Sequence, residues 1–297
     1  MIQRIQGIFA ALTTPFVEGD ASPDRFRENI RRYNDFGLQG YLVLGSTAES
    51  VCLSDEESLA LVRAARETAA PGRTILVGTA RESTRLTIDF TRRAADLGAE
   101  AALVRTPGYF RSQMNGDALK RHFTAVADAS PIPILIYNIP QNTGVAIESS
   151  IVVELSGHPR IAGIKDSSGN LAAVGEVVPR VARDFDFLLG AGSIVLPGLL
   201  MGAGGAILAV ADAVPGLCVD LFRLFTQGKL EEARKVQEMI IPLNRAVVPV
   251  YGIPGLKYAL DRLGYFGGLP RPPLLPLSDK GRTEIDFLLS EMSLTRP

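Results

Sequence analysis

The feature that most constrains the fold is an alternation of short apolar runs with longer stretches of helical spacing. The runs are Ile8–Thr13, Tyr41–Leu44, Ile75–Val77, Ala101–Val104, Ile134–Tyr137, Ile161–Ile164, Phe187–Leu189 and Ala206–Ala209. Most of them are separated by amphipathic stretches such as Asp24–Phe36 and Asp55–Ala69. Strands that alternate with helices indicate βαβ units and a parallel sheet. Because the runs are almost continuously apolar, we expect a sheet that is buried on both faces.

Eight such units predict an α/β protein whose strands close into a (β/α)₈ TIM barrel with a C-terminal helical appendage. After Ala211 the pattern is helical only. The expected helices are Val214–Thr226, Leu230–Val248, Gly255–Leu263 and Asp279–Met292. We therefore expect a catalytic barrel over residues 1–212 and a helical region over residues 213–297 that packs on it.

Composition excludes several classes of function. The formal net charge of −1 gives no bulk electrostatic reason to bind nucleic acid or an anionic membrane. Only two His and two isolated Cys are present, which argues against a metal site and against a disulfide scaffold. The N-terminus does not resemble a signal peptide, and no run approaches the length of a membrane span, so we expect a cytoplasmic protein without a membrane partner.

Lysine is scarce, with 25 Arg among the 31 basic residues, so the position of each Lys is informative. In a TIM barrel the active site lies at the C-terminal ends of the strands. Lys165 is the one Lys that directly follows a strand-like run; the other five, Lys257 included, are interpreted as surface residues. A partly desolvated, neutral Lys165 could attack a keto group and form an imine. The alternative is an ordinary ion pair with Asp166 or with a residue of a helix.

Two more groups lie at the ends of strand-like runs. Tyr137 ends the neighbouring run, and its phenol could exchange protons with a substrate bound at Lys165. It could equally be a buried Tyr whose hydroxyl is satisfied. Ser46 and Thr47 follow the second run, where hydroxyls and loop amides could hold a carboxylate, or could form a simple turn and cap.

Four motifs in order along the chain carry a resemblance to a known family. They are Ala11–Phe16, Gly45–Glu49, Tyr137–Gly144 and Gly163–Ser167. The chain resembles the dihydrodipicolinate synthase / N-acetylneuraminate lyase family, the pyruvate-dependent class I aldolases. The resemblance covers essentially the whole chain, including the helical tail.

This resemblance implies a role for each matching residue. Lys165 would form the imine with pyruvate or another 2-oxo acid, and Tyr137 would shuttle protons to and from it. Ser46 and Thr47 would bind the keto-acid carboxylate, with Ser46 also in the proton relay. Tyr109 matches a tyrosine that a neighbouring subunit inserts into this relay. The further substrate-binding candidates are Asn142, Ser167, Gly190 and Ile207.

The family also implies partners and cofactors. The partner would be a small 2-oxo acid, pyruvate, and the chain would assemble as a homotetramer built as a dimer of dimers. No cofactor and no metal would be needed, because the covalent imine through Lys165 is itself the electron sink.

The sequence constrains the identity of the aldehyde that reacts with pyruvate less than it constrains the pyruvate site. Asn142 stands where dihydrodipicolinate synthases carry an Arg that binds the carboxylate of the aldehyde. The segments Pro140–Gly144 and Gly252–Lys257 resemble 4-hydroxy-2-oxoglutarate aldolases, although Thr47 departs from the Asn usual there. We therefore place first the cleavage of 4-hydroxy-2-oxoglutarate to pyruvate and glyoxylate. The alternatives are dihydrodipicolinate synthase, which condenses pyruvate with aspartate semialdehyde, and a sugar-acid aldolase or dehydratase.

A non-catalytic 2-oxo-acid-binding regulator is the alternative from another class, and it would be expected to lack Lys165 or Tyr137. Both are present. The lysine-feedback site of bacterial synthases is not expected. Asp55 and Ser58 stand where that site typically has histidines, and Gly108 stands where it has a tyrosine.

Overall fold

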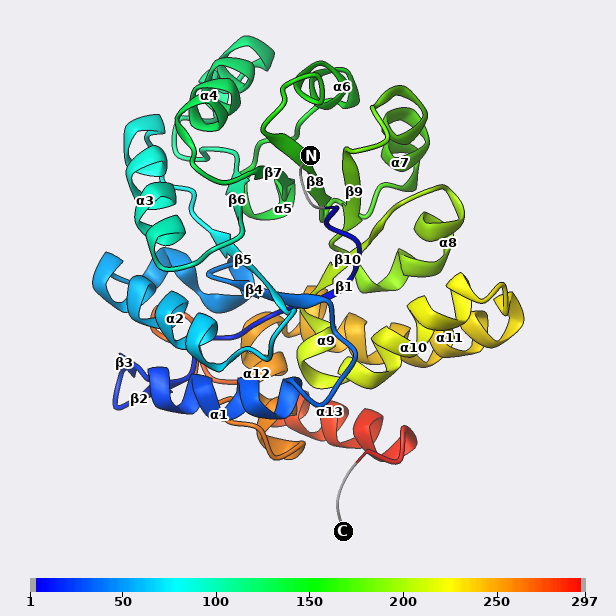
Figure 1. The fold of residues 1–297 in the computed structure, drawn as a ribbon. Coiled ribbons are helices and arrows are strands. Elements are labelled where there is room, and N and C mark those ends of the chain that lie inside the picture. The colour runs from blue at the N-terminus through cyan, green and yellow to red at the C-terminus, as the bar shows by residue number, and fades with distance from the viewer. Residues whose placement is uncertain (1–3, 295–297) are drawn as a thin grey trace. The chain divides into compact units, whose positions relative to one another are not determined.

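The computed structural model describes residues 4–294 and contains a closed parallel barrel with the strand order β1-β10-β9-β8-β7-β6-β5-β4 (Figure 1). The barrel strands are β1 (Gly7–Ala11), β4 (Gly40–Val43), β5 (Thr74–Gly78), β6 (Ala101–Arg105), β7 (Ile134–Asn138), β8 (Ile161–Asp166), β9 (Asp186–Leu189) and β10 (Gly205–Leu208). β2 (Phe16–Val17) and β3 (Asp20–Ala21) form a separate antiparallel pair. Each predicted strand overlaps one barrel strand, so the (β/α)₈ prediction is confirmed.

Helices connect the strands and form the C-terminal part of the chain. The helices are α1 (Pro23–Tyr33), α2 (Asp55–Thr68), α3 (Thr84–Asp96), α4 (Gly116–Ala129), α5 (Pro140–Thr143), α6 (Ser149–Leu155), α7 (Leu171–Val177), α8 (Val195–Leu200), α9 (Val210–Ala213), α10 (Pro215–Thr226), α11 (Leu230–Arg245), α12 (Gly252–Arg262) and α13 (Asp279–Glu291). No helix in this described part is long and apolar enough to cross a membrane.

The structure differs from the sequence prediction in two places. The short β2–β3 pair was not predicted, because two-residue strands carry no periodic pattern. The helix expected over Leu230–Val248 is divided, since α11 ends at Arg245 and a π-helical turn, η6 (Ala246–Val250), follows it. Pro249 lies within this turn and lacks the N–H that a continuous α-helix needs. The expected boundary after residue 212 stays a prediction.

Close contacts divide the described chain into two units, of which the first contains residues 4–7 and 75–207. In Figure 1, β6 to β9 lie side by side, with α3, α4, α6 and α7 outside them. The buried Asp186 at the start of β9 accepts hydrogen bonds from the Ile5 N–H and the Arg4 guanidinium. A Cβ at Gly163 would lie 2.2 Å from the Asp186 carbonyl oxygen, so only glycine fits this point of β8.

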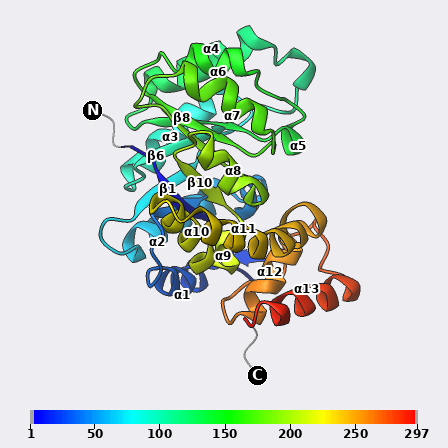
Figure 2. The ribbon, with the colours of Figure 1, turned by 90° about the vertical axis from the view of Figure 1, so that its right-hand side faces the viewer.

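The second unit contains residues 8–74 and 208–294. Ser54 begins α2 with a capping box: its hydroxyl accepts the Glu57 N–H, and the Glu57 carboxylate accepts the Ser54 N–H. α10 and α11 lie side by side, and α12 contacts α13 (Figure 2). The C-terminal helices are therefore packed on one another, not extended as an isolated tail.

An acidic side chain lies in the core of this second unit. Asp212 in α9 is fully buried, and its Oδ2 accepts a 2.9 Å hydrogen bond from the Thr13 N–H. Its Oδ1 has no hydrogen-bond partner among the described residues. Burial raises the pKa of Asp212 well above its ordinary value, and the Thr13 N–H opposes this only in part. Burial therefore favours the protonated form of Asp212.

We predict that Asp212→Asn removes a pH dependence of stability. Because the pKa of Asp212 is higher in the folded state than in the unfolded state, this carboxyl group contributes fully to stability below its unfolded pKa of about 4. This contribution is lost as pH rises toward the folded pKa, by at most about 1.4 kcal/mol per pH unit. Asn does not ionise. The free energy of unfolding of the variant, minus that of the parent protein, should therefore increase as pH rises. Urea denaturation of both proteins at pH 5 and pH 8 measures this difference, and an unchanged difference would contradict the assignment.

Candidate active site

The structure brings Tyr137 and Lys165 together at the C-terminal ends of β7 and β8. The two residues are register partners on neighbouring parallel strands. Lys165 is 4% exposed and Tyr137 is 5% exposed. The Lys165 Nζ lies 4.4 Å from the centre of the Tyr137 ring. An amine and a phenol thus share one buried position, where a carbonyl carbon bonded to the amine would lie within reach of the phenol.

The next residues along the two strands form a second, separate pair. Asn138 Nδ2 donates a 2.7 Å hydrogen bond to Asp166 Oδ2, and Asp166 Oδ1 accepts the Ser168 N–H. Because successive side chains on a strand point to opposite faces, this pair faces away from Tyr137 and Lys165. No ion pair joins Lys165 to Asp166 within residues 4–294, so the structure does not support an ion pair between these two residues.

Three candidate residues line the segments that follow these strands. Ser167 and Gly190 are in close contact, because a Cβ at position 190 would lie 1.9 Å from the Ser167 hydroxyl oxygen. The Gly190 N–H donates to the Asp166 carbonyl oxygen. Asn142 is exposed in the short helix α5, which is tied to the β8 end by a hydrogen bond from Gln141 to the Ser167 carbonyl oxygen. Ile207, in β10, is fully buried.

Ser46 and Thr47 lie in η1 (Ser46–Ala48), a short 3₁₀ helix of the second unit. Both residues are partly exposed. Leu44 and Glu49, on either side of this turn, have left-handed backbone conformations with φ of 60° and 56°. Such values are uncommon for residues other than glycine, Asn or Asp and persist where surrounding contacts hold the backbone. The turn that carries Ser46 and Thr47 is therefore a constrained segment.

A buried ion pair anchors Glu49, at one end of this turn. Glu49 Oε1 lies 2.7 Å from Lys257 Nζ of α12, and the side chains are 1% and 0% exposed. Lys257 also donates to the Leu269 carbonyl oxygen and lies over the Phe16 ring. Burial lowers the pKa of Lys257, and the Glu49 carboxylate opposes this shift. The prediction that Lys257 is a surface residue is wrong, because its charge is satisfied inside the unit by a carboxylate distant in sequence.

We predict that Lys257→Met destabilises the protein by about 3–5 kcal/mol, because it leaves the Glu49 carboxylate buried and unpaired. The double variant Glu49→Gln/Lys257→Met should recover much of this loss, since no charge then remains buried. Urea denaturation of the two variants and the parent protein measures both effects. A loss below about 1 kcal/mol for Lys257→Met would show that the pair is not a constraint on this turn.

Tyr109 lies apart from Tyr137 and Lys165, on the segment after β6. Its side chain is 79% exposed, and the adjacent Phe110 is 69% exposed. The two rings contact each other edge to face, with centroids 4.9 Å apart. Within the single chain Tyr109 is thus not part of the buried pair.

The histidines are engaged elsewhere. Burial lowers the pKa of His122 to about 4, and its Nδ1 lies 2.9 Å from the Thr84 hydroxyl. His158 Nε2 lies 3.1 Å from the Asp128 carboxylate. Among the residues that the structure describes, no group of three or more His, Cys, Asp or Glu could hold a metal ion.

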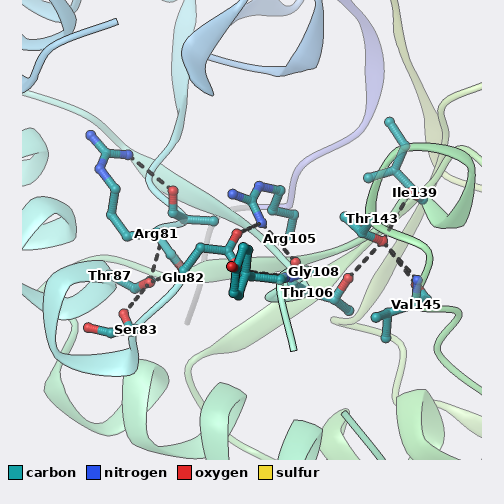
Figure 3. Close-up of polar contacts among 12 residues, drawn as sticks. Arg81, Glu82, Ser83, Thr87, Arg105, Thr106, Gly108, Ile139, Thr143 and Val145 are labelled. Atoms are coloured by element: carbon teal, nitrogen blue, oxygen red, sulfur yellow. Dashed lines mark hydrogen bonds and ion pairs between the residues drawn. The ribbon is translucent and has the colours of Figure 1, made fainter. Parts of the chain in front are cut away.

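The backbone around Tyr109 is held by residues that the sequence did not single out. Glu82 Oε2 accepts the Gly108 and Tyr109 N–H groups, and Arg105 pairs with Glu82 Oε1 (Figure 3). Burial acts to raise the pKa of Glu82, but the Tyr109 N–H, the Arg105 guanidinium and the Gly108 N–H together lower it. Glu82 precedes α3 without any motif, so no sequence signal identified it.

Comparisons with known proteins place these residues in a family context. Residues 4–292 match the Dihydrodipicolinate synthetase family. The 4-hydroxy-tetrahydrodipicolinate synthase of an Exiguobacterium species is 36% identical over 292 residues, which are 98% of this chain and 99% of that protein.

Solved structures give the same result. The 4-hydroxy-tetrahydrodipicolinate synthase of Methylacidiphilum fumariolicum superposes with a TM-score of 0.93 and 31% identity, over 98% of this chain and 96% of that one. A dihydrodipicolinate synthase variant described as monomeric superposes with a TM-score of 0.92 and 28% identity, over 98% and 97% of the two chains.

Proposed function

Because the chain belongs to the dihydrodipicolinate synthetase family, we propose that it forms an imine between Lys165 and pyruvate and makes or breaks a bond at the pyruvate methyl carbon. It is an enzyme of the lyase type, a class I aldolase or synthase. The observation that carries the proposal is the buried contact of Lys165 Nζ with the Tyr137 ring, 4.4 Å from its centre.

In the proposed reaction the neutral Lys165 amine attacks the C2 carbonyl of pyruvate, and water leaves to give an iminium ion. The iminium withdraws electrons from C3, which loses a proton and becomes the nucleophilic carbon of an enamine. That carbon adds to an aldehyde, whose oxygen takes up a proton. Water then hydrolyses the resulting iminium, which releases the 4-hydroxy-2-oxo acid and restores the Lys165 amine. In the cleavage direction these steps run backwards, and the protonated enamine is released as pyruvate by hydrolysis.

Tyr137 is the proposed proton donor and acceptor for these steps, since its ring lies directly beside the amine. Ser46 and Tyr109 would complete the relay, and Ser46 and Thr47 would bind the pyruvate carboxylate. The other proposed substrate contacts are Asn142, Ser167, Gly190 and Ile207. The imine through Lys165 supplies the electron sink, so no metal or cofactor enters the proposal.

We predict that Lys165→Arg abolishes turnover, because a guanidinium group stays protonated and cannot attack a carbonyl. Exchange of the pyruvate methyl protons with D₂O, followed by NMR, measures enamine formation without any aldehyde. The parent protein should exchange these protons and the variant should not. Exchange by Lys165→Arg at the parental rate would refute the role of Lys165.

Two acceptors remain candidates. The names of the relatives favour aspartate semialdehyde, so they support the alternative more than the first choice of the sequence analysis. One residue favours glyoxylate, the aldehyde that cleavage of 4-hydroxy-2-oxoglutarate releases. Asn142, exposed in α5, matches the position where the resemblance places the carboxylate-binding Arg of the synthases. An amide cannot make the two-pronged charged contact that a guanidinium makes with a carboxylate.

Parallel assays on one preparation separate these acceptors. Condensation of pyruvate with aspartate semialdehyde and cleavage of 4-hydroxy-2-oxoglutarate are compared by kcat/KM. If Asn142 decides the acceptor, cleavage should be faster, and Asn142→Arg should shift the ratio toward the semialdehyde by about tenfold. Faster use of the semialdehyde by the parent protein would establish the synthase function instead.

We also propose that the chain assembles as a homotetramer, a dimer of dimers. The exposed Tyr109–Phe110 pair supports a contact between copies, because two neighbouring aromatic rings are seldom left in water.

A further inference from the structure

The orientation of the Tyr109 phenol depends on what holds the segment that carries it. Its aromatic side chain is 79% exposed and contacts the Phe110 ring, which is itself 69% exposed, so this packing restrains the phenol only weakly. A proton relay requires donor and acceptor atoms within about 3 Å of each other, and small displacements are costly. If Tyr109 serves a relay, its orientation must come from the backbone that carries it.

Glu82 holds that backbone. Its Oε2 accepts hydrogen bonds of 3.0 Å and 2.9 Å from the consecutive N–H groups of Gly108 and Tyr109. Arg105, at the end of β6, lies 2.8 Å from Glu82 Oε1 and donates to the Thr106 carbonyl oxygen. We call this arrangement the Glu82 clamp: Glu82, Arg105 and the N–H groups of Gly108 and Tyr109. Figure 3 labels Glu82, Arg105 and Gly108 of this clamp.

The same segment is tied to the turn that follows Tyr137. The Thr106 hydroxyl donates a 3.1 Å hydrogen bond to the hydroxyl of Thr143, which is buried at the end of α5. A Cβ at Gly108 would lie 2.9 Å from the Thr143 carbonyl oxygen, so the backbone approaches this turn closely. Figure 3 shows Thr106 and Gly108 between Glu82 on one side and Thr143 on the other. The base of the Tyr109 segment is therefore fixed relative to the end of β7.

We propose that Glu82, oriented by Arg105, is a positioning residue that fixes the Tyr109 backbone and so presents the Tyr109 phenol to the relay of a second copy of this chain. The proposal rests on the proposed function, because it needs Tyr109 in the relay. The clamp is suited to this task since a carboxylate that accepts two adjacent N–H groups restrains both peptide planes. Its members lie near the surface, with Glu82 48% exposed, so they contribute little to the core.

The test uses pyruvate alone, by following exchange of its methyl protons with D₂O. Glu82→Ala should lower the maximal exchange rate about tenfold while the KM for pyruvate changes less than about twofold, as expected for loss of a charged hydrogen-bonding group that does not touch pyruvate. The exchange rate of Glu82→Gln should lie between those of the parent protein and Glu82→Ala. Its amide oxygen still accepts the N–H groups, but its NH₂ group faces Arg105. Arg105→Lys should stay close to the parent protein.

Glu154→Gln is the matched control. Glu154 forms a comparable exposed ion pair, 3.1 Å from Lys120, between α4 and α6 of the same unit. This variant should exchange pyruvate protons at the parental rate. A loss equal to that of Glu82→Ala would show that removal of any surface carboxylate has this effect, and would overturn the proposal.

A double variant separates positioning from simple stability. If Glu82 acts through Tyr109, Glu82→Ala should cost nothing further in a Tyr109→Phe background, whereas independent effects would multiply. Sedimentation velocity should show the parental assembly for Glu82→Ala. Multiplying effects, dissociation of the variant, or full activity of Glu82→Ala beside an active parent protein would each overturn the clamp. Absence of exchange in the parent protein would instead overturn the proposed function, and the clamp with it.

Discussion

The pairing of β7 with β8 is the constraint on which the proposed chemistry depends. Parallel register places Tyr137 directly beside Lys165, so that both side chains leave the sheet on the same face. A shift of one residue would turn one of them to the opposite face and separate the amine from the phenol. The register of β8 is further restricted at Gly163, where the Asp186 carbonyl oxygen leaves no room for a side chain.

Charged side chains outside this pair hold the segments that carry the remaining candidates. Inside the second unit, Lys257 and Glu49 form a buried ion pair at the turn of Ser46 and Thr47. In the first unit, Glu82 and Arg105 hold the Tyr109 backbone near the surface. The two ion pairs differ in their effect on stability. Removal of one partner of the buried pair leaves an unpaired charge without solvent, which is strongly destabilising, whereas the surface clamp mainly orients the backbone.

Much of the fold could be predicted from the sequence because its signals are local. Apolar runs such as Ile134–Tyr137 and amphipathic stretches such as Asp55–Ala69 depend on neighbouring residues only, and both were predicted. Lys165 and Tyr137 could be chosen because they follow such runs, and the barrel then brings them together. Their roles, and those of Ser46, remain predictions.

The contacts that were missed join residues far apart in sequence. Lys257 was taken for a surface residue because its partner, Glu49, lies in a different part of the chain, and a lone Lys in a helical pattern predicts solvent exposure. Glu82 lies near the Tyr109 segment because β5 pairs with β6, and this pairing brings together the segments that follow the two strands. The acceptor could not be fixed either, since Asn142 and the names of the relatives point to different aldehydes.

The central claim is that one particular lysine forms the imine, and borohydride reduction in the presence of pyruvate tests it most directly. Borohydride converts the imine to a stable secondary amine, which peptide mass analysis locates. Two lysines are buried in the described chain, Lys165 and Lys257, so the position of the adduct is informative. We expect a single adduct on Lys165 with Lys257 unmodified. The absence of an adduct, or an adduct on any other lysine, would contradict the assignment of this site.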